Sequence, residues 1–413
     1  MSVQSSVSRG RVRMLFVIVV AATATSCTIR SDEPSAVLLR TVDYLSRTQA
    51  EDGGWHSGTH GILRSGQAWT PFVLQQLLLA REVGVDVPDQ TIERGLDFIR
   101  QHVNEAGVLG LSDPAILEYP NYSTAAALTA VVLAGDASYN ELADVMASYL
   151  LAQQFVEDRG IGVEQLAYGS WGFGERTLRF AEVGHVDLSH TRRVAESLRL
   201  YRKRRAGGDA AVDSFMQAID RGLARSNAFL GLVQKLPADA RVVLGDHPQN
   251  RSPFDGGFYS SPVVHGTNKA GTATDASGNA YFVSYATTTA DGLLALLAAG
   301  ADHNDARVVA ARSWLRAHPA LDRPEGITPG RPGDWDRVMF LYHLASRSLA
   351  YEHIGETGSW GQEVAALLAD AQQPDGSFSN PEGGPNKEDD PILASALAME
   401  SLTAVLRARR MTD

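Results

Sequence analysis

The chain has 413 residues, of which 44% are hydrophobic and 21% are charged, a composition typical of a folded globular protein. Its formal net charge is −11, which disfavours nucleic acid and anionic lipid headgroups as partners. The composition therefore argues against a disordered chain and against a protein that binds nucleic acid through its charge.

The first residues follow the layout of a secretory signal. Arg9, Arg11 and Arg13 precede the apolar run Met14–Ala22, and small residues then lead to Cys27. The apolar run is too short to cross a bilayer as a permanent helix. This order of segments predicts export of the chain.

The ending ATSC, Ala24–Cys27, resembles the lipobox of bacterial lipoproteins, in which the cysteine becomes the first mature residue and carries lipid. The resemblance implies that lipid on Cys27 anchors the protein to a membrane at the cell envelope, facing away from the cytoplasm. An ordinary cleaved signal with an incidental cysteine is the alternative. Because the chain has one cysteine, it can form no internal disulfide. We expect a signal peptide at 1–26, a lipidated linker at 27–35 and a single domain at 36–413.

Apolar residues recur at intervals of three and four from residue 36 onward, which is the period of an amphipathic helix. The pattern predicts helices in pairs, with no convincing run of alternating strand residues. A helical pair that returns about every fifty residues indicates a repeat architecture. The predicted pairs are 36–49 with 66–83, 90–103 with 121–135, 141–154 with 188–203, 212–230 with 284–300, 305–318 with 334–352, and 360–373 with 389–409.

The second helix of several pairs is rich in alanine and apolar on more than one face, as in 123–134 and 287–299, whereas the first helices carry more charge. A helix that is apolar nearly all round is buried, and one with a polar side faces water. We therefore expect six inner helices surrounded by six outer ones. Because each pair is antiparallel, all inner helices then point the same way, and their N-termini gather at the end that the long loops feed.

A short signature recurs where outer helices end. It reads QAEDGGW at Gln49–Trp55 and QQPDGSF at Gln372–Phe378, with weaker copies at Tyr168–Gly174 and Phe254–Pro262. The signature predicts a helix end at Gln, a turn through Asp-Gly, and an aromatic ring packed against the helix just left. It resembles the QW repeats of squalene and hopene cyclases and of protein prenyltransferase subunits. This resemblance implies an all-α fold, an (α/α)6 toroid of six helix pairs.

A narrower resemblance is to bacterial secreted proteins described as prenyltransferase and squalene oxidase repeat proteins. The segments 254–262, 284–300, 339–352 and 372–402 carry it. It implies an apolar, isoprenoid-like molecule in the central cavity. The name of that group describes the repeat and not a reaction.

A class II terpene cyclase protonates an alkene with an aspartic acid in a D-x-D-D motif at the start of an inner helix. Here KEDD, Lys387–Asp390, holds that place, with Asp389 in the proton donor position and Lys387 in place of the first Asp. A neighbouring ammonium favours the ionised carboxylate, which is a poor acid. The alternative is that Asp390 caps a helix that starts at Pro391.

A protein prenyltransferase resemblance would imply zinc bound by Asp, Cys and the His of a D-x-Y-H motif. Tyr342 and His343 match the end of that motif, with Asp336 two turns earlier, but Phe340 replaces its Asp. No cysteine is left in the mature chain for zinc or for a thioester of the complement type. Since zinc sites use three protein ligands or more, we expect no metal and no cofactor.

Polysaccharide hydrolases and lyases also use rings of six helix pairs, with carboxylates in the loops at the mouth. Such residues are also helix caps or solvated loop charges in many folds, and a sequence does not show which of them face each other across a ring. The candidates here are Asp113, Glu118, Asp187, Asp334 and Asp336, together with His190.

Two long polar loops, 265–282 and 323–336, are placed to cover the mouth of the ring. Two functions stay open. One is an enzyme or carrier acting on an apolar molecule, and the other is a binding or scaffold protein without catalysis; a polysaccharide enzyme is a third, weaker alternative. The expected ligand contacts are Trp69, Tyr122, His190, Tyr285, Trp335, Asp336, Tyr342 and His343, with Asp389 and Asp390 as catalytic candidates.

Overall fold

The computed structural model describes residues 33–113, 116, 118–175, 178–205, 210–237 and 253–412. The predicted signal peptide and Cys27 lie outside these residues, so the predictions of export and lipidation stay predictions.

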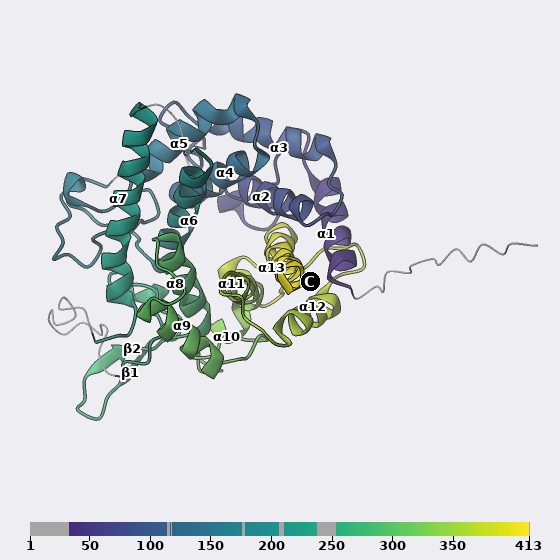
Figure 1. Cartoon of the computed structure of the whole chain (residues 1–413). Coiled ribbons are helices and arrows are strands. Elements are labelled where there is room, and N and C mark those ends of the chain that lie inside the picture. The colour runs from purple at the N-terminus through teal and green to yellow at the C-terminus, as the bar shows by residue number, and fades with distance from the viewer. Residues whose placement is uncertain are drawn as a thin grey trace, which may run out of the picture.

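Two concentric rings of helices form the fold, as the sequence predicts (Figure 1). The inner helices contact one another in chain order, and α13 contacts α2 to close the ring. The outer ring consists of α1 (Pro34–Thr48), α3 (Asp89–His102), α5 (Asn140–Ala152), α7 (Ala210–Val233), α9 (Ala306–Ala317) and α12 (Trp360–Ala371). The inner ring consists of α2 (Trp69–Glu82), α4 (Pro120–Ala134), α6 (Leu188–Arg205), α8 (Ala286–Ala298), α11 (Phe340–His353) and α13 (Pro391–Thr412).

The loops hold the remaining elements of the described residues. The short helix α10 (Trp335–Val338) precedes α11, and two strands, β1 (Thr272–Thr274) and β2 (Ala280–Phe282), pair antiparallel. Single turns of 3-10 helix lie at Gly61–Leu63, Ala137–Tyr139, Glu157–Arg159, His265–Thr267 and Gly384–Asn386.

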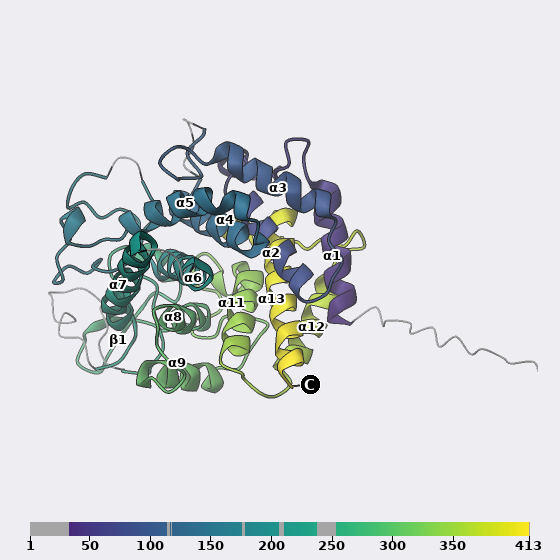
Figure 2. The same ribbon diagram turned by 45° about the horizontal axis from the view of Figure 1, so that its top comes forward.

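Burial separates the two rings as the composition predicts. In the inner helix α8, every residue except Leu297 is buried. The absence of a side chain at Gly292 lets α8 approach the ring of Phe258, since an added Cβ would lie 2.5 Å from that ring. The inner helix α13 is long and apolar enough to cross a membrane, but 67% of its apolar window is buried inside the ring. Figure 2 shows α13 beside α11 from a second direction.

The glutamine of the repeated signature joins neighbouring outer helices. Gln372, after α12, donates from its amide nitrogen to the carbonyl oxygens of Gly376 (3.1 Å) and of Val37 in α1 (2.9 Å). Gly376 has φ of 92°, and an added Cβ would lie 2.3 Å from the carbonyl oxygen of Arg40, so only glycine fits this turn. The same amide bridge recurs at Gln49 with Gly53 and Thr91, at Gln154 with Gly169 and Gly222, and at Gln234 with Gly256 and Arg307.

The aromatic residue of the signature joins the outer and inner rings. The indole of Trp55 is fully buried and donates to the carbonyl oxygen of Leu45 at the end of α1 (2.8 Å), while its backbone N–H donates to Thr70 in α2 (2.8 Å). Trp171 repeats both contacts, with Leu150 and Thr191. The predicted packing of the aromatic ring against the preceding outer helix is therefore present.

Two local features differ from the expectation of uninterrupted helices and loops without strands. The predicted helix at 334–352 is broken at Met339 into α10 and α11. The loop at 265–282 contains the β1–β2 hairpin, whose turn is held by the Asp275 carboxylate accepting the backbone N–H groups of Ser277 (2.9 Å) and Asn279 (2.8 Å). Strands of three residues are too short to leave a pattern in the sequence.

Candidate functional site

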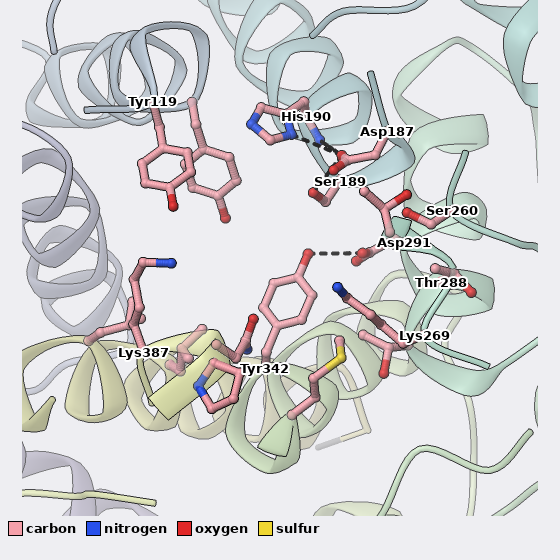
Figure 3. Close-up of a pocket in the computed structure, with 18 of the residues that line it drawn as sticks. Tyr119, Asp187, Ser189, His190, Ser260, Lys269, Thr288, Asp291, Tyr342 and Lys387 are labelled. Carbon is pink, nitrogen blue, oxygen red and sulfur yellow. Dashed lines mark hydrogen bonds and ion pairs between the residues drawn. The ribbon is translucent and has the colours of Figure 1, made fainter. Parts of the chain in front are cut away.

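A cavity of about 420 Å³ lies at the end of the ring where the inner helices begin, and we call it the mouth cavity. All six inner helices contribute side chains from their first turns, and the loops before them contribute others. The predicted gathering of inner N-termini therefore surrounds a real cavity. Figure 3 shows polar groups from several elements pointing into it.

Aromatic side chains form much of the wall of the mouth cavity. The five aromatic residues expected at the mouth all line it, and Tyr119, which the sequence analysis did not single out, lines it as well. Its ring packs on Phe173, with ring centroids 4.6 Å apart. The five expected residues are Trp69, Tyr122, Tyr285, Trp335 and Tyr342.

Backbone strain gathers around the same cavity. Of the four non-glycine residues with positive φ in the described part of the chain, Tyr119 (46°) and Lys387 (64°) line the cavity. A third, Asp334 (43°), directly precedes the lining residue Trp335. Such conformations cost on the order of 1–3 kcal/mol each and cluster at ligand sites. The strain is thus an independent sign that this cavity is functional.

Asp187 and His190 form a buried pair at the start of α6. The His190 Nδ1 lies 2.9 Å from the Asp187 Oδ1, which also accepts the backbone N–H of His190 (3.0 Å) and the hydroxyl of Ser189 (2.8 Å). The His185 Nε2 lies 2.9 Å from the other carboxylate oxygen. Burial alone raises the pKa of Asp187, but the two histidines hold it well below its ordinary value. Asp187 is therefore an ionised carboxylate that fixes His190.

Two lysines line the mouth cavity from the loops. The Lys269 ammonium lies 3.8 Å from the ring centroid of Trp335 and donates to the carbonyl oxygen of Gly266 (3.2 Å). The Lys387 ammonium lies 5.5 Å from the ring centroid of Tyr119. Within the described residues, no carboxylate pairs with either ammonium. Burial lowers the pKa of Lys269, and the charge of Lys387 adds to this effect, while the charge of Asp187 opposes it.

The two loops expected at the mouth pack on each other. Besides the contact of Lys269 with Trp335, the guanidinium of Arg331 donates to the carbonyl oxygen of Ala270 (2.7 Å). Gly326 has φ of 94°, and its Cα lies so close to α8 that a Cβ would be 2.3 Å from the carbonyl oxygen of Ser284. Parts of both loops therefore form one wall of the cavity.

Buried ion pairs cross the ring below the mouth cavity, and we call them the polar floor. Arg193 makes a bidentate pair with Glu400, at 2.7 and 2.9 Å, which joins α6 to α13. Arg192 pairs with Asp291 of α8 (2.6 Å), whose other oxygen accepts the hydroxyl of Tyr342 (2.9 Å). A second cavity of about 500 Å³ lies beyond, lined by later turns of the inner helices.

The residues in the place of the cyclase motif do not line the mouth cavity, apart from Lys387. Asp389 is half-buried and pairs with His60 (2.8 Å). Asp390 accepts the backbone N–H of Ile392 (3.0 Å) and the hydroxyl of Ser57 (2.8 Å), which is the geometry of a helix cap at the start of α13. The structure therefore places both catalytic candidates outside the cavity, one as a cap and one in a hydrogen bond with a histidine.

His343 and Asp336 are also absent from the cavity lining, contrary to their assignment as ligand contacts. His343 is fully buried, 3.3 Å from both the Thr287 hydroxyl and the Ala320 carbonyl oxygen. Burial lowers its pKa to about 3. The sequence indicated that Asp336 and His343 share one face of a continuous helix. The helix breaks at Met339, so they do not.

The carboxylates proposed for a polysaccharide enzyme have mostly local structural roles. Glu118 is buried and accepts the backbone N–H groups of Ser65 (2.9 Å) and Ala68 (3.1 Å), just before α2. Asp113 pairs with Arg64 (2.9 Å), and Asp334 lies at the N-terminal end of α10. Of this set, only Asp187 and His190 line the mouth cavity.

A second buried glutamate, which the sequence analysis missed, repeats the role of Glu118. Glu388 lies in the KEDD segment and accepts the backbone N–H groups of Leu341 and Tyr342, both at 2.9 Å, at the start of α11. Burial raises its pKa to about 7 in spite of these hydrogen bonds. The loop that precedes one inner helix thus caps its neighbour, which fixes the first turns around the cavity.

One group in the described residues has the spacing of a metal site. It consists of His185, Asp187 and His190, whose potential ligand atoms lie within 4.8 Å of one another. The Asp187 Oδ1 already accepts three hydrogen bonds, including one from the backbone of α6. The positive charge of Lys269 also acts on Asp187, which disfavours a cation there. The geometry therefore fits a hydrogen-bonded carboxylate–histidine pair better than a resident metal.

The Asp187–His190 pair could have been predicted from the spacing Asp-x-x-His at the start of a helix. An Asp that caps a helix lies close to the side chain of the third residue after it. The polar floor could also have been expected, because Arg192 and Arg193 lie in a predicted inner helix and buried charges require partners.

No family model matches the chain, and no curated protein matches its sequence. Among solved structures, the chain is similar to a variant of the type II terpene cyclase MstE from Scytonema in complex with geranylgeranyl dihydroxybenzoate, at 13% identity over 92% of this chain and 97% of that chain, with a TM-score of 0.52. It is similar to an alpha-1,6-mannanase from Salegentibacter sp., at 11% identity over 92% of this chain and 100% of that chain, with a TM-score of 0.50. It is also similar to a protein described as a glycosidase, at 13% identity, 91% and 97% coverage and a TM-score of 0.53. The chain therefore has the alpha/alpha toroid fold that terpene cyclases and (α/α)6 glycosidases share.

Proposed function

We propose that this protein binds an apolar, isoprenoid-like molecule with an anionic end in the mouth cavity. The observation that carries the proposal is the meeting of aromatic walls with two lysines, Lys269 and Lys387, that have no carboxylate partner among the described residues. In this proposal the aromatic rings contact the apolar part, and the two ammonium groups contact the anion.

The size and walls of the cavity support the apolar part of this ligand. A cavity of about 420 Å³ lies in the range of small-molecule sites, which are mostly apolar with a few placed polar groups. The aromatic residues come from four separate inner helices or their preceding loops, so a bound chain is enclosed from several sides. Each buried methylene of such a chain contributes about 0.8 kcal/mol to binding.

The charges of the cavity support the anionic end. Its two carboxylates are already engaged, Asp187 by histidines and Asp291 by Arg192 and a tyrosine hydroxyl. The two lysines are the only Lys or Arg side chains in the described lining of the cavity, and no carboxylate forms an ion pair with them among the described residues. An anion between the two ammonium groups would remove the repulsion that helps to lower the pKa of Lys269.

Binding fits the geometry better than the two chemistries known for this fold. A cyclase acid must reach the substrate, whereas Asp389 is hydrogen-bonded to His60 and does not line the cavity. Glycoside hydrolysis uses two carboxyl groups, one of them protonated, and the described lining offers only the engaged Asp187 and Asp291. The solved terpene cyclase complex, with its prenylated benzoate, is consistent with a toroid cavity that holds such a ligand.

The charge of the ligand is tested with farnesyl phosphate and farnesol. We expect the full-length protein to bind the phosphate more tightly than the alcohol, because only the phosphate pairs with both lysines. Replacing either lysine, in Lys269→Gln or Lys387→Gln, should weaken phosphate binding about tenfold, since a hydrogen bond to a charged group contributes about 1.5–3 kcal/mol. Farnesol binding should stay unchanged. Isothermal titration calorimetry measures both ligands.

Lys203→Gln is the matched control, because Lys203 lines the second cavity at the opposite end of the ring. It should leave both affinities as they are in the wild type. Equal binding of phosphate and alcohol, or the same loss in the control as in Lys269→Gln, would contradict an anion site at the mouth.

We further propose that the protein is exported and anchored by lipid on Cys27, on the support of the N-terminal sequence alone. Cys27→Ala should then abolish incorporation of a fatty-acid probe and release the protein from the membrane fraction. Labelling and sedimentation of cells that express each form measure this. A Cys27→Ala protein that still incorporates the probe and sediments with membranes would refute lipidation at this residue.

A further inference from the structure

One buried polar atom in the mouth cavity has no hydrogen-bond partner in the described part of the chain. His190 lines the cavity and is 6% exposed, and its Nε2 contacts no hydrogen-bond partner among the described residues. Figure 3 shows its other ring nitrogen turned toward Asp187. A buried polar atom without a hydrogen bond lowers the stability of the fold by about 1–3 kcal/mol. A bound molecule that hydrogen-bonds to the Nε2 would remove this penalty.

The contacts of His190 fix which kind of partner its Nε2 needs. The ionised Asp187 carboxylate can only accept hydrogen bonds, so the nitrogen that faces it, Nδ1, carries the hydrogen. In the neutral imidazole the Nε2 then has a free lone pair and accepts a hydrogen bond, whereas in the imidazolium it donates one. A hydroxyl group is a partner for either form, because it can donate its hydrogen or accept one through its oxygen.

The ring of His190 cannot easily turn to find another partner. Besides the bond to Asp187, the rings of Tyr122 and Phe173 lie with centroids 5.8 Å from it, and the ring of Tyr119 lies at 6.5 Å. The hydroxyl of Tyr122 is engaged by the guanidinium of Arg193 (3.1 Å). The Nε2 is therefore held in place by the groups around the ring.

We infer that His190 recognises a hydroxyl group of the ligand, which hydrogen-bonds to the Nε2, with Asp187 as the positioning residue behind it. This inference rests on the proposed function and narrows it, because the ligand is then an apolar molecule with an anionic group and a hydroxyl group. A buried polar nitrogen selects strongly for such a group, since an analogue without the hydroxyl leaves the nitrogen unpaired.

The experiment compares ligands that differ in one hydroxyl. The probes are straight-chain alkanoic acids of six to twelve carbon atoms and their ω-hydroxy derivatives, with calorimetry on the full-length protein. At one or more chain lengths we expect the hydroxy acid to bind at least tenfold more tightly than its parent. His190→Phe, which keeps an aromatic ring but removes the Nε2, should abolish that preference and leave the parent acids bound as before.

His60→Gln is the control variant, because His60 lies outside the cavity lining and pairs with Asp389; it should keep the preference. A readout that needs no variant is the ¹⁵N chemical shift of the His190 Nε2 in the wild type. It should move when a hydroxy acid is added and stay in place with the parent acid, which covers the case that His190→Phe does not fold.

The outcomes separate the two proposals. Parent acids that bind without any preference for their hydroxy derivatives would overturn the hydroxyl site and leave the anion site standing. A preference that persists in His190→Phe would also overturn it, as would a loss of parent binding in that variant, because His190 would then contact the anion. If none of the acids binds, the proposed function fails, and this inference fails with it.

Discussion

Trp55→Ala should lower the free energy of unfolding by about 3–5 kcal/mol, the usual cost of removing a large buried aromatic side chain. The Trp55 ring is fully buried, and its indole N–H and backbone N–H tie the end of α1 to the start of α2. The substitution therefore removes packing and one inter-ring hydrogen bond at the same place. Chemical denaturation followed by circular dichroism measures the change.

Phe180→Ala is the matched control, since the Phe180 side chain is 75% exposed and its loss should change stability by less than about 0.5 kcal/mol. Trp171 occupies the equivalent place between α5 and α6, so Trp171→Ala should behave like Trp55→Ala. If Trp55→Ala and Trp171→Ala both match the control, the repeated signature is a surface turn and does not join the rings.

Arg193→Met should destabilise the protein by about 3–5 kcal/mol, because it leaves the Glu400 carboxylate buried without its partner. Both side chains are nearly inaccessible and share two short hydrogen bonds across the polar floor. Although burial raises the pKa of Glu400, the charge of Arg193 holds it below its ordinary value. Urea denaturation of the variant and the wild type measures the loss.

The double variant Arg193→Met with Glu400→Leu should recover most of that loss, since replacing a whole buried ion pair by apolar groups is often close to neutral. Arg316→Met is the control for removing a guanidinium, because the Arg316 pair with Glu356 is half-exposed and contributes about 1 kcal/mol or less. A double variant as unstable as Arg193→Met would show that the buried charge of Glu400 is not the cause.

The helix pairs and their two rings could be predicted because their signals are local or compositional. The three- and four-residue period marks each helix, and a helix such as α8, apolar nearly all round, has to be buried. The repeated Gln, Asp, Gly and aromatic signature marked the ends of outer helices. Its glutamine was not predicted as a bridge, because the partner of Gln372 is Val37, at the other end of the chain.

The aromatic part of the site could be predicted, whereas most of its polar part could not. Trp69 and Tyr122 lie in the first turn of predicted inner helices. Because all inner helices of the predicted toroid begin at the mouth, this places both residues there. Lys269 and Lys387 lie in loops far apart in sequence, and only the folded ring brings them to one cavity. Their presence in one cavity therefore depends on long-range packing, which a local sequence pattern cannot predict.

The side-chain directions of the two catalytic candidates could not be predicted, for a related reason. A motif position identifies a residue near the mouth, but not whether its side chain turns inward. Asp389 turns to His60 and Asp390 to the backbone of α13, while Lys387, expected only to weaken a neighbouring acid, lines the cavity itself. The direction of each side chain is set by its hydrogen-bond partners, which the sequence does not list.

Photo-cross-linking with a diazirine-bearing farnesyl phosphate analogue, followed by peptide mass spectrometry, tests the central claim most directly. The proposal predicts labels on the lining of the mouth cavity, such as Trp69, Tyr122 and Trp335, and competition by unlabelled farnesyl phosphate. Labels concentrated in the second cavity, for example at Leu79 and Leu349, or labels on the outer helices that do not compete, would contradict a ligand site at the mouth.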